Sequence, residues 1–297
     1  MINPTESENK YIIVTDTACD LSQEMLDSLG IIALPMHVII HGEDYLHYAD
    51  YRNLSKEDFF DMLKKYDDVT TSQVDLTAAE DTLRSLAESG KDILYIAFSS
   101  GLSGTYSAVK MIGEDLSEEF PERKIFVIDS LCASGGEGLL CYLAAKKKEG
   151  GLSIEELRDW IENNKLRICH WFTVDDLDHL KRGGRISAAT ATIGGLLKIK
   201  PIMYMDRKGH LTPNSKAAGR SMSLDAIANK MEKHSDTREF DTVMISQAQC
   251  RTDAETLKEK ILSRFKIGEV IIVDIDPIIA AHTGKGCISL FFVGNER

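Results

Sequence analysis

The sequence predicts an α/β protein of two domains: an N-terminal parallel sheet sandwiched by helices, and a C-terminal α/β domain with a mixed sheet. In the first half, short apolar runs rich in β-branched residues alternate with stretches of helical length, a pattern typical of parallel strands joined by crossovers. In the second half, a glycine-bearing turn between two apolar runs indicates a hairpin beside further crossovers. The 297 residues suffice for two domains. We expect these domains at residues 11–165 and 166–297.

The N-terminal domain is expected to alternate strands with helices. Asp20 or Ser22 can cap its first helix and Gly30 can end it. Pro35 lies inside the second strand and indicates an edge or a bulge. Residues 70–73 are expected in a loop between two helices. The expected strands are 11–16, 31–40, 92–98 and 124–129, and the later helices are 55–66, 76–89, 103–117, 135–149 and 153–164.

The C-terminal domain is expected to open with a strand over 166–174, followed by a polar, glycine-bearing stretch. A turn at 207–209 should join two hairpin strands. The other expected helices are 188–197, 216–233 and 252–265, and the other strands are 242–248, 269–275 and 287–293. The first ten residues are polar and acidic, and we expect a short disordered lead there.

Composition excludes several classes of protein. Lys and Arg number 35 against 47 Asp and Glu, a net charge of −12. Such a chain is a poor general nucleic-acid binder and a poor ligand for anionic membranes. No apolar run approaches the roughly 20 residues that span a bilayer, and no hydrophobic signal region is present, so we expect no stable membrane insertion and a cytoplasmic location. The six cysteines and eight histidines show no metal-ligand spacing, so we expect reduced thiols and no metal.

The stretch SSGLSGT, residues 99–105, joins a buried strand to a helix. One interpretation is local: Gly101 and Gly104 allow the turn, and Ser103 caps the helix. The other is functional: Ser100 and the free amides of the helix start hold an anion, which the helix dipole favours. The stretch has neither the lysine of a phosphate-binding loop nor the spacing of a nucleophile elbow. Both interpretations stay open on these residues alone.

Two other segments could contribute to a site. His282 precedes Thr283-Gly284-Lys285-Gly286, where glycines let the backbone approach a ligand closely and the imidazole could hydrogen-bond a carboxylate. LKRGGRIS, residues 180–187, together with Lys198 and Lys200, is a basic segment in an acidic chain. It is either a solvated turn or a docking surface for an acidic or phosphate-bearing partner.

Seven motifs occur along nearly the whole chain in the order found in the DegV family, also called fatty-acid-binding EDD-domain proteins. The sequence therefore resembles that family. The motifs are VTDTACDLS (14–22), TTSQ (70–73), SSGLSGTYSA (99–108), IDS (128–130), LKRGGRIS (180–187), LLKIKPI (196–202) and IIAAHTGKG (278–286).

The resemblance implies a lipid-binding carrier rather than an enzyme, with one long-chain fatty acid held between two α/β domains and no cofactor. It implies that a separate fatty acid kinase, the ATP-binding partner, phosphorylates the bound carboxylate for phospholipid synthesis. It places carboxylate binding on Thr71, Ser100 and His282, and partner docking on Arg185. The supporting residues would be Ser72, Ser99, Gly101, Thr283 and Gly284.

This sequence departs from the family pattern at three places. Val74 replaces the proline that usually follows TSQ, Asp276-Pro277 stands where Gly-Pro is common, and Lys285 replaces a proline. These changes affect loop shape and leave the hydroxyls and His282 in place. Burial of about 14 methylenes would give up to roughly 11 kcal/mol, so the tail can supply affinity while neutral hydroxyls orient the head.

Two enzymatic alternatives remain on the residues. A serine hydrolase could use Ser100 as nucleophile and His282 as base, although the elbow and a third residue to orient the imidazole are missing. A phosphotransferase would need a lysine-bearing phosphate loop and metal-binding carboxylates, and neither pattern occurs.

Overall fold

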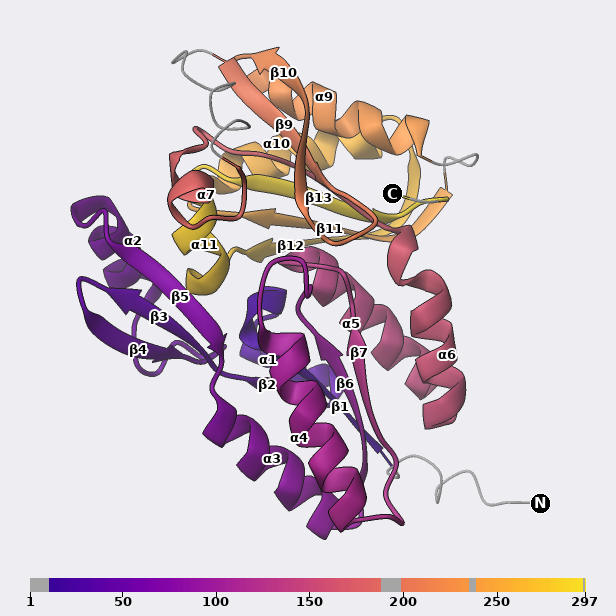
Figure 1. The fold of residues 1–297 in the computed structure, drawn as a ribbon. Coiled ribbons are helices and arrows are strands. Elements are labelled where there is room, and N and C mark those ends of the chain that lie inside the picture. The colour runs from indigo at the N-terminus through magenta and orange to yellow at the C-terminus, as the bar shows by residue number, and fades with distance from the viewer. Residues whose placement is uncertain (1–10, 188–198, 235–238, 296) are drawn as a thin grey trace.

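The computed structural model describes residues 11–187, 199–234, 239–295 and 297. Within these ranges it contains a four-stranded parallel sheet, a six-stranded mixed sheet and a three-stranded antiparallel sheet, with helices against the first two (Figure 1). The predicted fold class is confirmed. The predicted lead and the predicted helix 188–197, as well as Lys198, lie outside the described residues.

The parallel sheet has the strand order β2-β1-β6-β7. Its strands are β1 (Tyr11–Asp16), β2 (Ile31–Leu34), β6 (Asp92–Ala97) and β7 (Ile125–Asp129). Because all four run the same way, the polar segments that follow β1, β6 and β7 meet at one edge. The helices of this half are α1 (Gln23–Leu29), α2 (Lys56–Lys65), α3 (Leu76–Glu88), α4 (Thr105–Glu119), α5 (Gly135–Glu149) and α6 (Ile154–Asn164).

Side chains on successive residues of the parallel strands enter two different cores, as the strand period requires. Val14 and Tyr95 face the core that includes α3 and α4, whereas Ile13 and Leu94 face the core that includes α5 and α6. Helices therefore cover both faces of this sheet. Ser22 caps α1 through a hydrogen bond from the Met25 amide, and Gly30 ends it in the left-handed conformation, two of the features expected for that helix.

The predicted strand 31–40 is wrong as a single element. Pro35 separates β2 from β3 (Met36–Ile40), which pairs in a different, antiparallel sheet with β4 (Glu43–His47) and β5 (Val69–Val74). The predicted loop at 70–73 is also wrong, because these residues form most of β5. Threonine is a good strand former even without apolar neighbours, and the ends of β5 are buried valines that pair with β3.

The mixed sheet has the order β10-β9-β8-β13-β11-β12, and within it only β11 and β12 are paired in parallel. The predicted hairpin is confirmed between β9 and β10. The long helix expected from 216 begins later, because β10 continues to Ala218. The strands are β8 (Ile168–Thr173), β9 (Ile199–Met205), β10 (Leu211–Ala218), β11 (Glu239–Gln247), β12 (Lys266–Asp274) and β13 (Ile288–Val293), and the helices are α7 (Asp178–Arg182), α9 (Arg220–Lys233), α10 (Arg251–Leu262) and α11 (Pro277–Thr283).

Helix α5 lies between the parallel sheet and the mixed sheet (Figure 1). It contacts β1 on one side and β11 and β13 on the other. Close approach requires glycine at its start, because a Cβ at Gly136 would lie 2.1 Å from the His170 ring nitrogen Nε2. The chain passes from the parallel sheet and its helices to the mixed sheet through a short 3-10 turn, Lys165–Arg167.

Helix α11 belongs to the C-terminal half but packs against β3 and β5 of the N-terminal half, as well as against α7. The small antiparallel sheet, the edge of the parallel sheet and the mixed sheet therefore meet around α11. None of the described helices combines the length and apolar character needed to cross a membrane.

Candidate functional site

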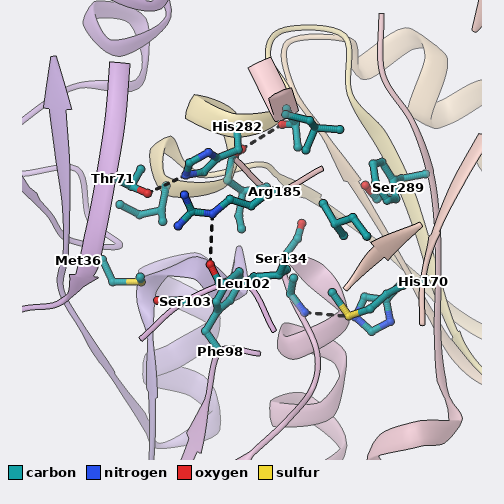
Figure 2. A pocket seen from close by; sticks show the side chains of 18 of the residues that line it. Met36, Thr71, Phe98, Leu102, Ser103, Ser134, His170, Arg185, His282 and Ser289 are labelled. Atoms are coloured by element: carbon teal, nitrogen blue, oxygen red, sulfur yellow. Dashed lines mark hydrogen bonds between the residues drawn. The ribbon is translucent and has the colours of Figure 1, made fainter. Parts of the chain in front are cut away.

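A cavity lies where these elements meet, with about 700 Å³ of space unoccupied by protein atoms, its opening included. Both halves of the chain contribute to its walls, which are mainly apolar (Figure 2). The apolar lining residues are Met36, Phe98, Leu102, Ala133, Phe172, Leu180, Met205, Leu211, Ile278, Ile279 and Phe291. The remaining lining residues are Thr71, Ser72, Ser103, Ser134, His170, Arg185, His282, Thr283 and Ser289.

Thr71 and His282 meet across the two halves of the chain at one side of this cavity (Figure 2). The Thr71 hydroxyl oxygen lies 2.7 Å from Nε2 of His282, so β5 and α11 share a hydrogen bond. Burial, together with the positive charges of Arg185 and His179, lowers the pKa of His282 to about 3. The imidazole is therefore neutral at ordinary pH. Its Nδ1 is enclosed and has no hydrogen-bond partner among the described residues.

Strand β5 is tied to the turn that follows β6. The Val74 amide donates to the Thr105 hydroxyl at 3.2 Å, and the Thr105 amide donates to the Ser103 hydroxyl at 3.2 Å. These bonds fix the side of the cavity that carries Thr71 relative to the side that carries Ser103. Ser103 lines the cavity immediately before Gly104, the N-cap of α4.

The structure does not place Ser100 in the cavity lining. Ser100 is exposed, and its amide donates to the Asp129 carboxylate at 3.1 Å. Its neighbours contact the C-terminal half instead. The Ser99 hydroxyl donates to the Gly209 carbonyl at 2.9 Å. Gly101 packs closely against the same carbonyl, because a Cβ at Gly101 would lie 2.7 Å from its oxygen. Among the serines of the SSGLSGT turn, the one that lines the cavity is Ser103, which the sequence analysis considered only as a helix cap. Its position one residue before the helix N-cap is the signal that could have identified it.

Arg185 lines the cavity rather than projecting from an outer surface (Figure 2). Its Nε donates to the Leu102 carbonyl at 3.2 Å, and burial lowers the pKa of its guanidinium. Two glycines explain this placement. Gly184 is in the left-handed conformation and turns the chain back after α7, and a Cβ at Gly183 would lie 2.0 Å from Nδ1 of His282. The sequence analysis expected hydroxyls and His282 at the head of the site and assigned Arg185 to partner docking, whereas the structure places this half-buried cation in the cavity lining.

The other supporting residues have different positions. Ser72 and Thr283 line the cavity, although the Thr283 hydroxyl donates to the Ile279 carbonyl of its own helix at 3.1 Å. Gly284 ends α11 at φ 71° and is not a lining residue. Ser100 and His282 do not form a pair in this cavity, because only the histidine lines it. Within the described parts of the chain, no cluster of three or more His, Cys, Asp or Glu side chains is arranged to hold a metal ion.

The model of the DegV family matches residues 10–295 of the sequence. A DegV domain-containing protein of Clostridium perfringens is 39% identical over 97% of this chain and 99% of its own length. The chain belongs to the DegV family. The resemblance identified from the seven motifs is thereby confirmed.

Solved structures of DegV proteins share the fold over nearly the whole chain. A fatty-acid-binding DegV family protein from Streptococcus agalactiae has a TM-score of 0.83 and 26% identity, over 97% of this chain and 100% of that one. The B3 protein of fatty acid kinase from Streptococcus pneumoniae, which was solved loaded with linoleic acid, has a TM-score of 0.85 and 20% identity, over 96% and 100%.

Proposed function

We propose that this DegV protein binds a long-chain fatty acid in the cavity between its two halves and presents the carboxylate to a separate fatty acid kinase. The observation that carries the proposal is the shape of the lining: a long apolar wall with a polar cluster of Thr71, Ser103, Arg185 and His282 at one side. An amphiphile with a small anionic head and a saturated or unsaturated tail has the matching distribution of polar and apolar groups.

The polar cluster can bind a carboxylate without a metal or cofactor. In the tautomer that carries its proton on Nε2, neutral His282 donates to the Thr71 oxygen, and the Thr71 hydroxyl proton is then free to point at the ligand. The Arg185 guanidinium supplies positive charge and further donors. Ser103 completes the set from the turn that precedes α4. In this proposal Ser103 takes the role that the sequence assigned to Ser100.

The apolar walls supply most of the affinity. Each methylene removed from water contributes about 0.8 kcal/mol, so a tail of 14 methylenes gains up to roughly 11 kcal/mol before the costs of binding. Phe98 and Phe172 come from opposite halves of the chain, so the tail would contact both domains at once. A ligand in this position is shielded from water and must be exposed or reoriented to react.

Presentation to a kinase is the finer part of the proposal. The sequence lacks a phosphate-binding loop, so the transferred phosphate must come from another protein with bound nucleotide. The similarity of fold to the B3 protein of a fatty acid kinase supports a partner of that class. Acyl phosphate formed in this way would enter phospholipid synthesis.

The test begins with the purified protein, denatured and extracted with organic solvent, with the extract analysed by mass spectrometry. We expect a long-chain fatty acid at close to one equivalent. The delipidated protein is then titrated with oleate and mixed with ATP, with and without a fatty acid kinase. Acyl phosphate should form only when the kinase is present. Absence of a fatty acid from the extract together with no uptake of oleate would refute the carrier function.

A further inference from the structure

The cavity described above, which Thr71, Arg185 and His282 line, is called the lipid cavity below. A second cavity, which is polar, lies between the two halves of the chain beside Asp276, the residue that precedes α11. It has about 610 Å³ of space unoccupied by protein atoms, its opening included. Three carboxylates line it, together with hydroxyls, an imidazole and two basic residues. Its lining includes Asp20, His47, Tyr51, Lys56, Asp274 and Asp276. We call it the acid cavity.

Asp20 connects the two walls of the lipid cavity through its carboxylate. One oxygen, Oδ2, accepts from the Ser134 hydroxyl and from the Gly135 amide at 2.9 Å, at the start of α5. The other, Oδ1, accepts from the Asp276 amide at 3.0 Å, at the start of α11. Ser134 itself lines the lipid cavity. One side chain therefore ties a lipid-lining residue of the N-terminal half to the helix that carries His282.

Asp276 fixes α11 directly. Its Oδ1 accepts from the Ile279 amide at 2.9 Å, so it is the N-cap of this helix, and Pro277 follows at the first helical position. Its Oδ2 is buried and has no hydrogen-bond partner among the described residues. Burial of this oxygen opposes a charge on the Asp276 carboxyl group, whereas the hydrogen bond to Oδ1 favours that charge.

Several residues around Asp20 and Asp276 have strained backbone conformations. Asp20, Tyr51 and Ser134 adopt φ values of 60°, 58° and 57°, which residues other than glycine rarely take. Ser134 combines its φ with a ψ of −148°, a region used almost only by glycine. Such strain persists where the surrounding contacts over-determine the conformation, and it concentrates at functional positions.

The basic residues near Asp20 and Asp276 are paired with other carboxylates. From α2, Lys56 is paired with Asp274, and from α10, Arg251 pairs with Glu255 at 2.6 Å. Asp16 at the end of β1 and Glu137 on α5 add nearby buried carboxyls, and the aromatic rings of His47 and Tyr51 complete the surroundings. Burial raises the pKa of Asp20 to about 6, and burial together with Asp20 raises the pKa of Asp276 well above its ordinary value.

We propose that Asp20 and Asp276 are positioning residues of the lipid site: their buried carboxyl groups hold Ser134 and α11 in the closed arrangement, and the charge that builds up on them as pH rises favours opening and release of the fatty acid. The inference deepens the proposed function and rests on it. Neither carboxyl needs to touch the lipid, since both act through the walls that do.

The direction of the pH effect follows from linkage. The two acids come from opposite halves of the chain, so separating the halves would hydrate both and return each pKa towards about 3.9. The closed protein then holds more protons than the open one. Each proton lost on opening makes opening about tenfold more favourable per pH unit, between the open-state and closed-state pKa values. For Asp20 that interval ends near pH 6, and Asp276 acts in the same direction because burial also raises its pKa.

The experiment measures the rate at which bound cis-parinaric acid, a fluorescent fatty acid, leaves the purified protein when excess oleate is added, from pH 5 to pH 8. We expect the wild-type rate to rise with pH by up to tenfold per unit for each proton released. Asp276→Asn keeps the helix cap, because asparagine is an equally good N-cap, but it cannot ionise. This variant should show a flattened rise. Asp20→Asn should flatten the lower part of the curve.

Asp274→Asn is the matched control, since that carboxylate shares the acid cavity but is 41% exposed and paired with Lys56. It should retain the wild-type slope. A slope in Asp276→Asn equal to that of the wild type would overturn the inference. So would a release rate raised equally at every pH, which indicates a purely structural role. Failure of the wild type to bind cis-parinaric acid or oleate would instead refute the proposed function.

Discussion

The two cavities between the halves of this chain differ in charge: helix α11 lines the first, and Asp276, the residue before that helix, lines the second. The lipid cavity combines apolar walls with Arg185 and a neutral His282, whereas the acid cavity is lined by three aspartates. An anionic head therefore meets a cation and apolar walls in the first cavity, whereas in the second it meets three carboxyl groups beside Lys56 and Arg251. The comparison indicates that the polar groups of each wall, rather than cavity size, decide which ligand each space can hold.

The two cavities also differ in their response to pH. Burial lowers the pKa of His282 and raises the pKa values of Asp20 and Asp276, so in both cavities burial favours the neutral form of these groups. Lowering the pH therefore destabilises the folded lipid cavity by protonating His282. Raising the pH destabilises the closed arrangement at the acid cavity by ionising Asp20 and Asp276. The following predictions separate the two cavities, in order of decreasing effect.

Filling the lipid cavity should have the largest effect on binding. Ala133 lines that cavity, and Ala133→Phe would place a ring in the space proposed for the tail. We expect affinity for oleate to fall by more than about 100-fold, because a filled cavity cannot bury the methylenes. Fluorescence titration measures the affinity.

Ala49→Phe is the control for that experiment, because Ala49 lines the acid cavity. Both changes should cost roughly 1–3 kcal/mol of stability through overpacking. Only Ala133→Phe should lose the lipid. Equal loss of binding in both variants would show that the two cavities are not functionally distinct.

Removing the cation from the lipid cavity should have the next largest effect. Arg185→Ala should weaken oleate binding about tenfold to a hundredfold, the range for a hydrogen bond to a charged group of about 1.5–3 kcal/mol. Arg182→Ala removes an arginine three residues earlier that pairs with exposed Asp67, and it should bind normally. Unchanged affinity in Arg185→Ala, with loss of acyl phosphate formation by the kinase, would restore the docking role expected from the sequence.

His282 should make folding sensitive to acid. The unfolded chain protonates this histidine near pH 6.5, while the folded chain resists until about pH 3. The unfolded state therefore binds more protons between these values, and stability falls as pH falls through the window. His282→Gln removes this contribution. Between pH 7.5 and pH 5, the wild type should lose about 2 kcal/mol more free energy of unfolding than the variant, measured by urea denaturation at each pH. Parallel curves for the two proteins would contradict the neutral, enclosed imidazole.

The parallel sheet could be predicted from the sequence because its strands carry their own signal. Runs such as YIIVTD are β-branched and buried on both faces, so the local pattern and the tertiary position agree. Strand β5 lacked that signal: TTSQ has no apolar alternation, and its identity as a strand depends on pairing with β3. The hydroxyl residues Thr71 and Ser72, which were expected from the motif to contribute to the site, line the cavity.

Two other features depend on contacts that no local pattern reports. The side-chain direction of Arg185 follows from the turn at Gly183 and Gly184 and from the packing of His282 against it. The bond between Asp20 and Asp276 joins residues 256 positions apart. A single sequence therefore located the segments of the site but not the directions in which their side chains point.

The serines after β6 give the smallest effect and the most direct test of that distinction. Ser103 lines the lipid cavity, whereas Ser100 is exposed beside Asp129. Ser103→Ala should weaken oleate binding by roughly twofold to tenfold, as expected for one hydrogen bond of about 0.5–1.5 kcal/mol. Ser100→Ala, the matched change three residues away, should bind as the wild type does. Titration of both variants at one pH decides between them. A loss confined to Ser100→Ala would mean that the turn reorganises when the lipid enters, since the hydroxyl outside the cavity would then have to rotate into it.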